Sequence, residues 1–231
     1  MDFAIIAAGE GSRLVEEGVS LPKPLVKIGG EPMIDRLVKL FMAQDAETVH
    51  IIVNREMVEV QEHIKALAKH YPIRLVVKST PSSMHSFHEL SEGITCDKFC
   101  LTTVDTIFRE EDFAAYVKAF AATSGIDGLM GVTSYIDDEK PLYVEVDADN
   151  RIVNFRDVDY DGSKYISGGI YGLTQAAIPV LKQCIAEGVS RMRNFQRRLV
   201  TEGLNLKAYP FTKIIDVDHA SDIEKAQRFL R

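Results

Sequence analysis

The chain has 231 residues, of which 46% are hydrophobic and 26% are charged. This composition is typical of a globular protein and excludes the disordered and fibrous classes. The net charge of −7 argues against a nucleic-acid partner, which would need a broad basic face, but a single anionic ligand needs only a local cluster of donors. No apolar stretch approaches the roughly 20 residues of a membrane span, so no membrane partner is expected, and the N-terminus lacks the basic segment of a signal peptide.

The cysteines are Cys96, Cys100 and Cys184. Their number is odd, and their spacing is not that of a metal site or a disulfide framework. We therefore expect reduced thiols and a cytoplasmic protein. The sequence carries no signal for an oligomeric state.

In the first half of the chain, short apolar runs alternate with segments of helical period. The runs predict strands at 3–8, 49–53, 73–77 and 99–104, and the periodic segments predict helices at 33–43, 58–68, 84–90 and 111–121. Continuous apolar strands that alternate with helices indicate an α/β fold, Rossmann-like, with a mixed but mostly parallel sheet between two helical layers. Right-handed crossovers would place the loops that follow these strands at one edge of the sheet.

The second half has a different pattern. Strands at 142–146 and 152–155 flank a turn-rich tetrapeptide, which predicts a hairpin. After a polar loop at 157–164, the next strand contains Gly168 and Gly169, which indicate a close backbone approach. The remaining elements are expected as a strand at 166–173, helices at 176–186, 192–201 and 221–230, and strands at 206–209 and 214–217. We expect one domain over residues 1–231, with an antiparallel elaboration near 135–175.

A glycine-rich segment directly follows the first strand. Gly9 and Gly11 permit tight turns and leave backbone N–H groups open to an anion. Ser12 adds a hydroxyl, and Arg13 adds a forked donor suited to phosphate oxygens. Taken alone, a Gly-x-Gly pair after a strand is explained equally well by a surface loop.

Lys23 lies between Pro22 and Pro24. The two prolines restrict the backbone, so we expect an extended, stiff segment that presents the ammonium as a point charge. Two better-known phosphate motifs are excluded, because position 14 is a leucine where the dinucleotide fingerprint needs glycine, and no Gly-Lys-Ser/Thr follows the loop.

The longer string IIAAGEGSRL…LPKPLVK, residues 5–27, closely resembles the signature of the sugar-phosphate nucleotidyltransferase family, and GGEPMI at 29–34 resembles its continuation. The resemblance extends over nearly the whole chain and implies the nucleotide-diphospho-sugar transferase type of fold. It implies that Arg13 and Lys23 are catalytic and hold the phosphates of a nucleoside triphosphate (NTP). The residues that it assigns to nucleotide binding in this loop are Ala7, Ala8, Gly9, Gly11 and Ser12.

Acidic side chains lie at two later strand ends. Asp105 follows the strand at 99–104, where ligands collect in an open α/β sheet, and a carboxylate there suits Mg²⁺. A strand-end aspartate that caps the next turn is the alternative. The resemblance implies that Asp105 and Asp216 bind Mg²⁺ as the cofactor, with Asp218 as a further candidate, although Val104 replaces the family's usual glycine.

The segment 81–86 resembles the part of the family that contacts the base. Ser82 and Ser83 stand where the family has Gly-Thr, and serines that open a helix are also ordinary N-caps, so the base stays open. His85 and His88 lie on one predicted helical face but lack a third metal ligand.

The resemblance also implies an acceptor pocket. Asp157 resembles the residue that binds the sugar, Gly168 and Gly169 resemble a strand that lines the same pocket, and Lys164 is a candidate for the acceptor's phosphate. A polar loop explains Asp157 and Lys164 almost as well.

The function implied is transfer of a nucleotidyl group from an NTP to a sugar 1-phosphate or similar phosphorylated small molecule, with release of pyrophosphate. Phosphocholine or a molybdenum cofactor as acceptor is the related alternative. The departures at Ser82, Ser83, Val104 and Asp218 also leave open a nucleotide-binding domain without catalysis.

Overall fold

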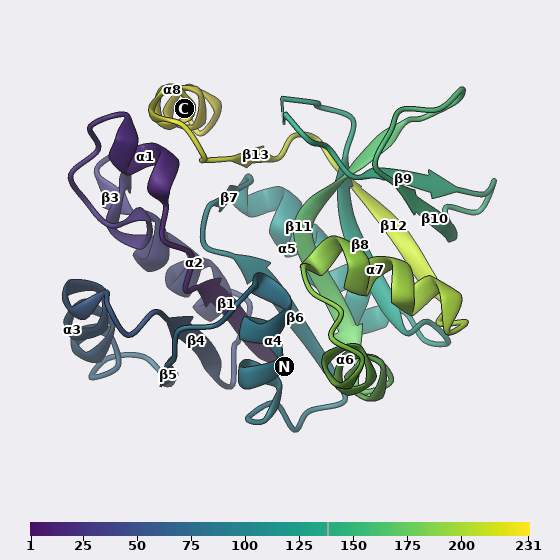
Figure 1. The fold of residues 1–231 in the computed structure, drawn as a ribbon, viewed down its shortest axis with the longest axis horizontal. Coiled ribbons are helices and arrows are strands. Elements are labelled where there is room, and N and C mark those ends of the chain that lie inside the picture. The colour runs from purple at the N-terminus through teal and green to yellow at the C-terminus, as the bar shows by residue number, and fades with distance from the viewer. Residues whose placement is uncertain (138) are drawn as a thin grey trace.

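The computed structural model describes residues 1–137 and 139–231. At its centre, the described residues form a nine-stranded mixed sheet, with helices on both faces (Figure 1). Seven strands run in the order β10-β9-β11-β6-β1-β4-β5, and β8 and β12 extend the sheet from β11. The predicted class, a Rossmann-like α/β fold with three layers, is confirmed.

The first half forms the parallel part of the sheet. Its strands are β1 (Asp2–Ala7), β4 (Val49–Val53), β5 (Ile73–Val77) and β6 (Lys98–Thr103), all parallel to one another. The helices between them are α2 (Met33–Met42), α3 (Val58–Leu67) and α4 (Ser83–Ser91). Strands and helices begin and end within two residues of the predicted positions.

Side chains of β1 alternate between the two helical layers. Phe3 and Ile5 belong to the core cluster that includes α2 and α3, whereas Ala4 and Ile6 belong to the cluster that includes α4. A strand can be apolar at every position only when both faces of its sheet are covered. The continuous apolar run at the N-terminus is therefore explained by the three layers.

The second half supplies antiparallel strands. The hairpin of β9 (Tyr143–Val146) and β10 (Ile152–Arg156) lies beside β11 (Tyr165–Thr174), which is antiparallel to β6. The remaining long elements are β12 (Leu206–Phe211), α5 (Glu110–Ala122), α6 (Ala177–Ala186), α7 (Met192–Thr201) and α8 (Ala220–Phe229). No helix of the described residues is long and apolar enough to cross a membrane.

The strand β8 (Gly128–Thr133) was not predicted, although it is buried along its whole length between β11 and β12. Glycines interrupt its pattern because its neighbours press close. A Cβ on Gly128 would lie 2.8 Å from Leu206 Cδ2, and one on Gly131 would lie 2.9 Å from Ile170 Cβ.

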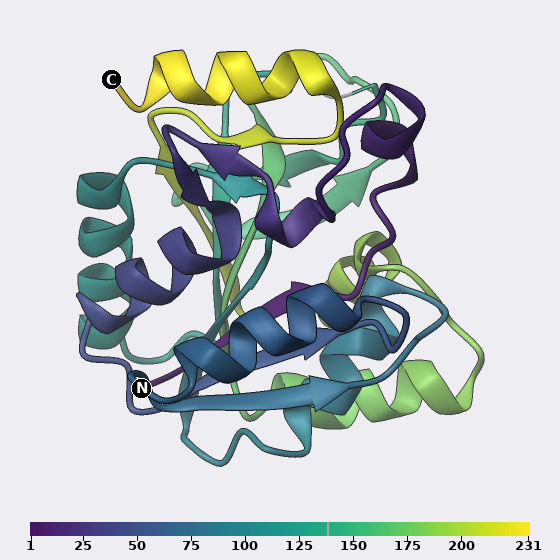
Figure 2. The same cartoon turned by 90° about the vertical axis from the view of Figure 1, so that its left-hand side faces the viewer.

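Short elements gather at the carboxyl ends of the parallel strands: α1 (Ser12–Glu16), the 3₁₀ turn η1 (Lys23–Leu25), β2 (Lys27–Ile28) with β3 (Glu31–Pro32), and β7 (Thr106–Ile107) with β13 (Ile215–Asp216). Figure 2 shows α8 and β13 at the same end of the molecule as α1.

The expectation of an extended segment at Lys23 is wrong. The N–H groups of Leu25 and Val26 donate to the carbonyls of Pro22 and Lys23 over 2.8 and 3.2 Å, so the chain forms a 3₁₀ turn. These hydrogen bonds outweigh the preference for extended backbone before a proline.

Candidate functional site

The loops that follow β1, β4, β5 and β6 meet at one edge of the sheet, as the crossovers require. They enclose a cavity of about 490 Å³, called here the glycine-loop cavity. It is lined by residues after each of these strands, including Ala8, Gly9, Asn54, Thr80 and Asp105. Ala7, by contrast, ends β1 with only 1% of its surface exposed and packs in the core.

The two glycines of the loop meet different demands. A Cβ on Gly9 would have no neighbour within 4 Å, whereas one on Gly11 would lie 2.9 Å from Lys23 Cβ. Gly11 also has a φ of +64°, which glycine adopts without strain. Within the described chain, the N–H groups of Gly9, Glu10 and Gly11 donate no backbone hydrogen bond, so they are open to an anion.

Lys23 joins the glycine loop to two aspartates. Its Nζ lies 2.5 Å from Asp105 Oδ2 and 2.7 Å from Asp218 Oδ1, and Arg13 Nη1 lies 3.0 Å from Asp218 Oδ2. The turn that follows Pro22 buries the lysine side chain to 9% exposure. The site is thus a chain of alternating charges in which Asp218 bridges the two predicted catalytic cations.

Burial and charge act in opposite directions on this cluster. Burial alone would lower the pKa of Lys23, but the carboxylates of Asp105 and Asp218 raise it above its ordinary value. Burial alone would raise the pKa of Asp105, but the charge and hydrogen bond of Lys23 hold it below its usual value. Both groups are therefore ionised at neutral pH.

The β7–β13 ladder brings Asp105 and Asp216 to the same place. Asp216 pairs with Thr106, and the N–H of Val217 donates to the carbonyl of Asp105 over 3.1 Å. The two aspartates line a second cavity of about 430 Å³, called here the β11–α7 cavity. It shares Ser83, Thr103 and Asp105 with the glycine-loop cavity, so the two cavities adjoin at Asp105.

Two carboxylates at one cavity fit a Mg²⁺ ion, which proteins usually bind through one or two carboxylates plus substrate phosphates. The described residues contain no group of three or more His, Cys, Asp or Glu side chains placed to hold a metal alone. A metal at Asp105 and Asp216 would therefore take its remaining ligands from water and from oxygens of a bound substrate.

The predicted Gly168-Gly169 pair forms a bulge in β11. The pairing of β11 with β8 shifts register between Ser167 and Ile170. A Cβ on Gly169, whose φ is +71°, would lie 2.9 Å from Thr106 Oγ1, and one on Gly168 would lie 2.2 Å from Ile214 Cδ1. The expected close approach is confirmed, and it brings β11 against the turn that carries Asp105.

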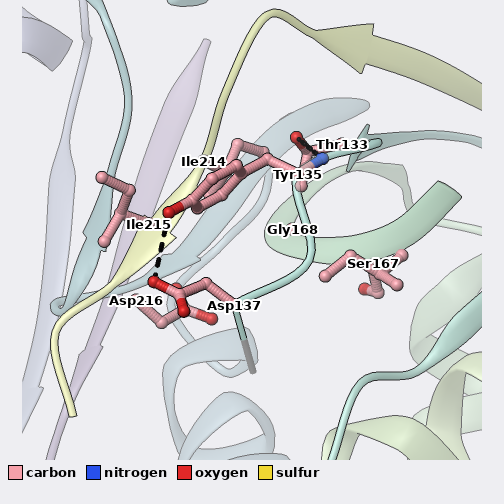
Figure 3. A pocket seen from close by; sticks show the side chains of 9 residues that line it. Thr133, Tyr135, Asp137, Ser167, Gly168, Ile214, Ile215 and Asp216 are labelled. Carbon is pink, nitrogen blue, oxygen red and sulfur yellow. Dashed lines mark hydrogen bonds between the residues drawn. The ribbon is translucent and has the colours of Figure 1, made fainter. Parts of the chain in front are cut away.

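A small niche of about 30 Å³ is lined in part by Asp216. Figure 3 shows its lining, in which the Tyr135 hydroxyl donates to Asp137 Oδ2 over 3.2 Å. Ser167 and Asp216 line both this niche and the β11–α7 cavity. Its volume suits about one water molecule. Because the two share lining residues, we treat the niche as a small extension of the larger cavity.

Two of the predicted acceptor residues, Asp157 and Lys164, do not line the β11–α7 cavity. Asp157 is held by Arg193 and Arg197, with N–O distances of 2.6 Å to each, and the hydrogen bond from Arg197 is the main reason that its pKa is lowered. Lys164 lies over the ring of Tyr165, 4.9 Å from the centroid. Neither lines the β11–α7 cavity, whereas Gly169 does.

Ser82 and Ser83 both line the glycine-loop cavity. The Ser82 hydroxyl makes no capping bond to the backbone of α4. It lies 2.9 Å from His85 Nδ1 and accepts the N–H of Arg191 over 3.2 Å. The Ser82 hydroxyl therefore does not cap α4, so helix capping does not explain the serine at this position.

Sequence reasoning missed several cavity residues. Asn54 and Thr80 follow β4 and β5, and their position after a strand could have identified them. Lys140, Arg191 and Arg193 supply cationic groups to the β11–α7 cavity from segments whose local patterns give no such signal.

Residues 4–231 match the model of the nucleotidyl transferase family, NTP_transferase, and the chain belongs to this family. The bifunctional protein GlmU of Methanococcus maripaludis strain C7 is 24% identical over 243 residues, covering 100% of this chain and 54% of the relative. The chain thus spans about half the length of the curated relatives it matches.

Solved structures share the fold. A putative glucose-1-phosphate thymidylyltransferase from Bacillus anthracis matches with a TM-score of 0.86 and 20% identity, covering 100% of this chain and 95% of that one. The inositol-1-phosphate CTP transferase from T. maritima matches with a TM-score of 0.81 and 19% identity, covering 100% and 97%.

Proposed function

We propose that this chain transfers a nucleotidyl group from an NTP to a phosphorylated small molecule of the sugar 1-phosphate class. The observation that carries the proposal is the pair of adjoining cavities, one with anion donors and the other with Asp216, which share the carboxylate of Asp105.

The NTP belongs in the glycine-loop cavity. The free N–H groups of Gly9, Glu10 and Gly11 suit phosphate oxygens, and Lys23 and Arg13 supply positive charge beside them. Ser82 and Ser83 lie farther along the same cavity and would contact the nucleoside.

The phosphorylated acceptor belongs in the β11–α7 cavity. Its cationic side chains, Lys140, Arg191 and Arg193, suit an anionic acceptor and oppose the ammonium group of phosphocholine. Asp157 and Lys164 do not line this cavity, so we assign the acceptor contacts to the residues that do, Gly169 among them.

Asp105 and Asp216 would hold Mg²⁺, which when bound would offset phosphate charge. Lys23 and Arg13 hold the triphosphate of the NTP. An oxygen of the acceptor's phosphate attacks the α-phosphorus, the bond from that phosphorus to the bridging oxygen breaks, and pyrophosphate leaves with the electron pair. A phosphate monoester needs no strong base, so the protein's task is positioning and charge stabilisation.

The test is pyrophosphate release with ATP, CTP, GTP, UTP or dTTP, each paired with glucose 1-phosphate, inositol 1-phosphate or phosphocholine. We expect release with one sugar or inositol phosphate, its loss in EDTA and its return with MgCl₂. NTP binding without release from any pair would contradict the proposal and favour a binding domain.

We further propose that residues 1–231 act as one nucleotidyltransferase domain, with the antiparallel elaboration at about 135–175 forming part of the acceptor side. The three cysteines form no disulfide, which supports a reducing compartment, and we propose the cytoplasm.

A further inference from the structure

Arg191 has an unusual backbone. Its φ of 70° and ψ of 139° lie in a region that side-chain-bearing residues rarely adopt. The other non-glycine residues with positive φ among those described are Asp45 and Asn150, residue types that tolerate such turns. A conformation of this kind is energetically unfavourable and persists where the surrounding structure enforces it, often at a functional site.

The surroundings of Arg191 explain how the conformation is held. Its N–H donates to the Ser82 hydroxyl over 3.2 Å, which ties the start of α7 to the start of α4. Farther along, the rings of Phe87 in α4 and Phe195 in α7 pack edge to face with centroids 5.7 Å apart. Two contacts between these helices thus position the residue on the β11–α7 cavity.

The side chain of Arg191 has no charged partner among the described residues. It is exposed, and within the described residues its guanidinium forms no ion pair. Arg193, Arg197 and Arg198, by contrast, are all paired with carboxylates. Arg191 thus offers a free guanidinium to the same cavity as Ser83, Asp105 and Asp216.

Charge identifies the ligand group. A phosphate monoester that enters this cavity meets the carboxylates of Asp105 and Asp216, and a cation must offset their repulsion. A guanidinium is suited to phosphate because its planar fork matches two oxygens. We propose that Arg191 binds the phosphate group of the acceptor and selects phosphorylated acceptors, and this inference rests on the proposed function.

The strained backbone allows an experiment that separates binding from folding. Glycine accepts a positive φ without strain, so Arg191→Gly removes the guanidinium while relieving the backbone. The matched control is Asn150→Gly, which makes the same backbone change in the β9–β10 turn. Both variants and Arg191→Lys are compared with the wild type in melting temperature and in KM for each substrate, with glucose 1-phosphate, inositol 1-phosphate and phosphocholine as probe acceptors.

We expect Arg191→Gly to melt at or above the wild-type temperature and to raise the KM of the active acceptor roughly 10-fold or more, the loss of one charge-assisted hydrogen bond. The NTP KM should stay within about two-fold. Arg191→Lys should be intermediate, and Asn150→Gly should match the wild type in both KM values.

An acceptor KM that is unchanged in Arg191→Gly would overturn the inference while the wild type remains active. An equal rise in the NTP KM would also overturn it. A wild type that releases no pyrophosphate with any probe would instead overturn the proposed function, and this inference with it.

Discussion

The ammonium of Lys23 is neutralised by two carboxylates before any substrate binds. Asp105 holds it from the turn after β6, and Asp218 holds it from the segment before α8 while also pairing with Arg13. A triphosphate would need the same cations. If the triphosphate binds as proposed, Asp218 would compete with its phosphates for Lys23 and Arg13, and its side chain would have to move away when they bind.

Lys23→Ala should lower kcat by about 10²–10³-fold, the cost of removing one preorganised charge from a transition state. Lys27→Ala is the control, because Lys27 is exposed and close in the sequence. Circular dichroism should show both variants folded. Near-full pyrophosphate release by folded Lys23→Ala would refute the catalytic role.

Asp218→Asn should strengthen NTP binding several-fold, because a neutral amide competes less for Lys23 and Arg13. The measurement is the KM for the NTP at several MgCl₂ concentrations, with Glu224→Gln on α8 as a control. If Asp218 were instead a metal ligand, the variant would need more Mg²⁺ and turn over more slowly, which is the opposite result.

At the scale of the element, the two glycines in the loop between β1 and α1 have different surroundings. Gly11 lets the loop pack against Lys23, and Gly9 faces open space on the cavity. Under the proposed function, the contact at Gly11 matters for folding and the open space at Gly9 matters for the approach of the NTP, so substitutions at the two positions should separate stability from binding.

Gly11→Ala should lower the free energy of unfolding by about 1–2 kcal/mol, since its φ is positive and the new Cβ meets Lys23. Gly9→Ala should leave the unfolding free energy unchanged, yet raise the NTP KM because the methyl group lies where the phosphates approach. Urea denaturation and NTP titration of both variants test this. Equal losses of stability in the two would contradict it.

At the scale of the whole molecule, the central sheet positions the site and also buries a histidine that makes the stability of the fold sensitive to acid. His50 in β4 is 2% exposed and lies 3.3 Å from Asp2. Burial lowers the pKa of His50, although Asp2 partly opposes the shift. The folded state therefore favours the neutral ring, and its contribution to stability is present above the unfolded pKa of about 6.5 and is lost as the pH falls below it.

Urea denaturation should accordingly show a drop in unfolding free energy from pH 7.5 to pH 5.5. His50→Gln, which cannot take up the proton, should show a smaller drop. His70→Gln is the control, because His70 is exposed. A drop as large in His50→Gln as in the wild type would show that other groups govern this range.

Local patterns sufficed for the parallel half of the fold and for the glycine loop. Apolar runs identify β1, β4, β5 and β6, and the crossover rule then predicts that Gly9 and Asp105 lie at one edge. They failed at β8, where packing demands the glycines that weaken a strand pattern, and at the turn of Lys23, where local hydrogen bonds outweigh the proline effect.

By itself, the sequence determined the class of fold, the glycine loop after β1 and the aspartate after β6, because these depend on periodicity and on residues close in the chain. Only the tertiary structure decided that Asp218 bridges Lys23 and Arg13, that Asp157 is held by arginines of α7, and that Arg191 faces the second cavity. These relations join segments far apart in the chain, and distances between such segments follow from the packing of helices on the sheet, which no local pattern records.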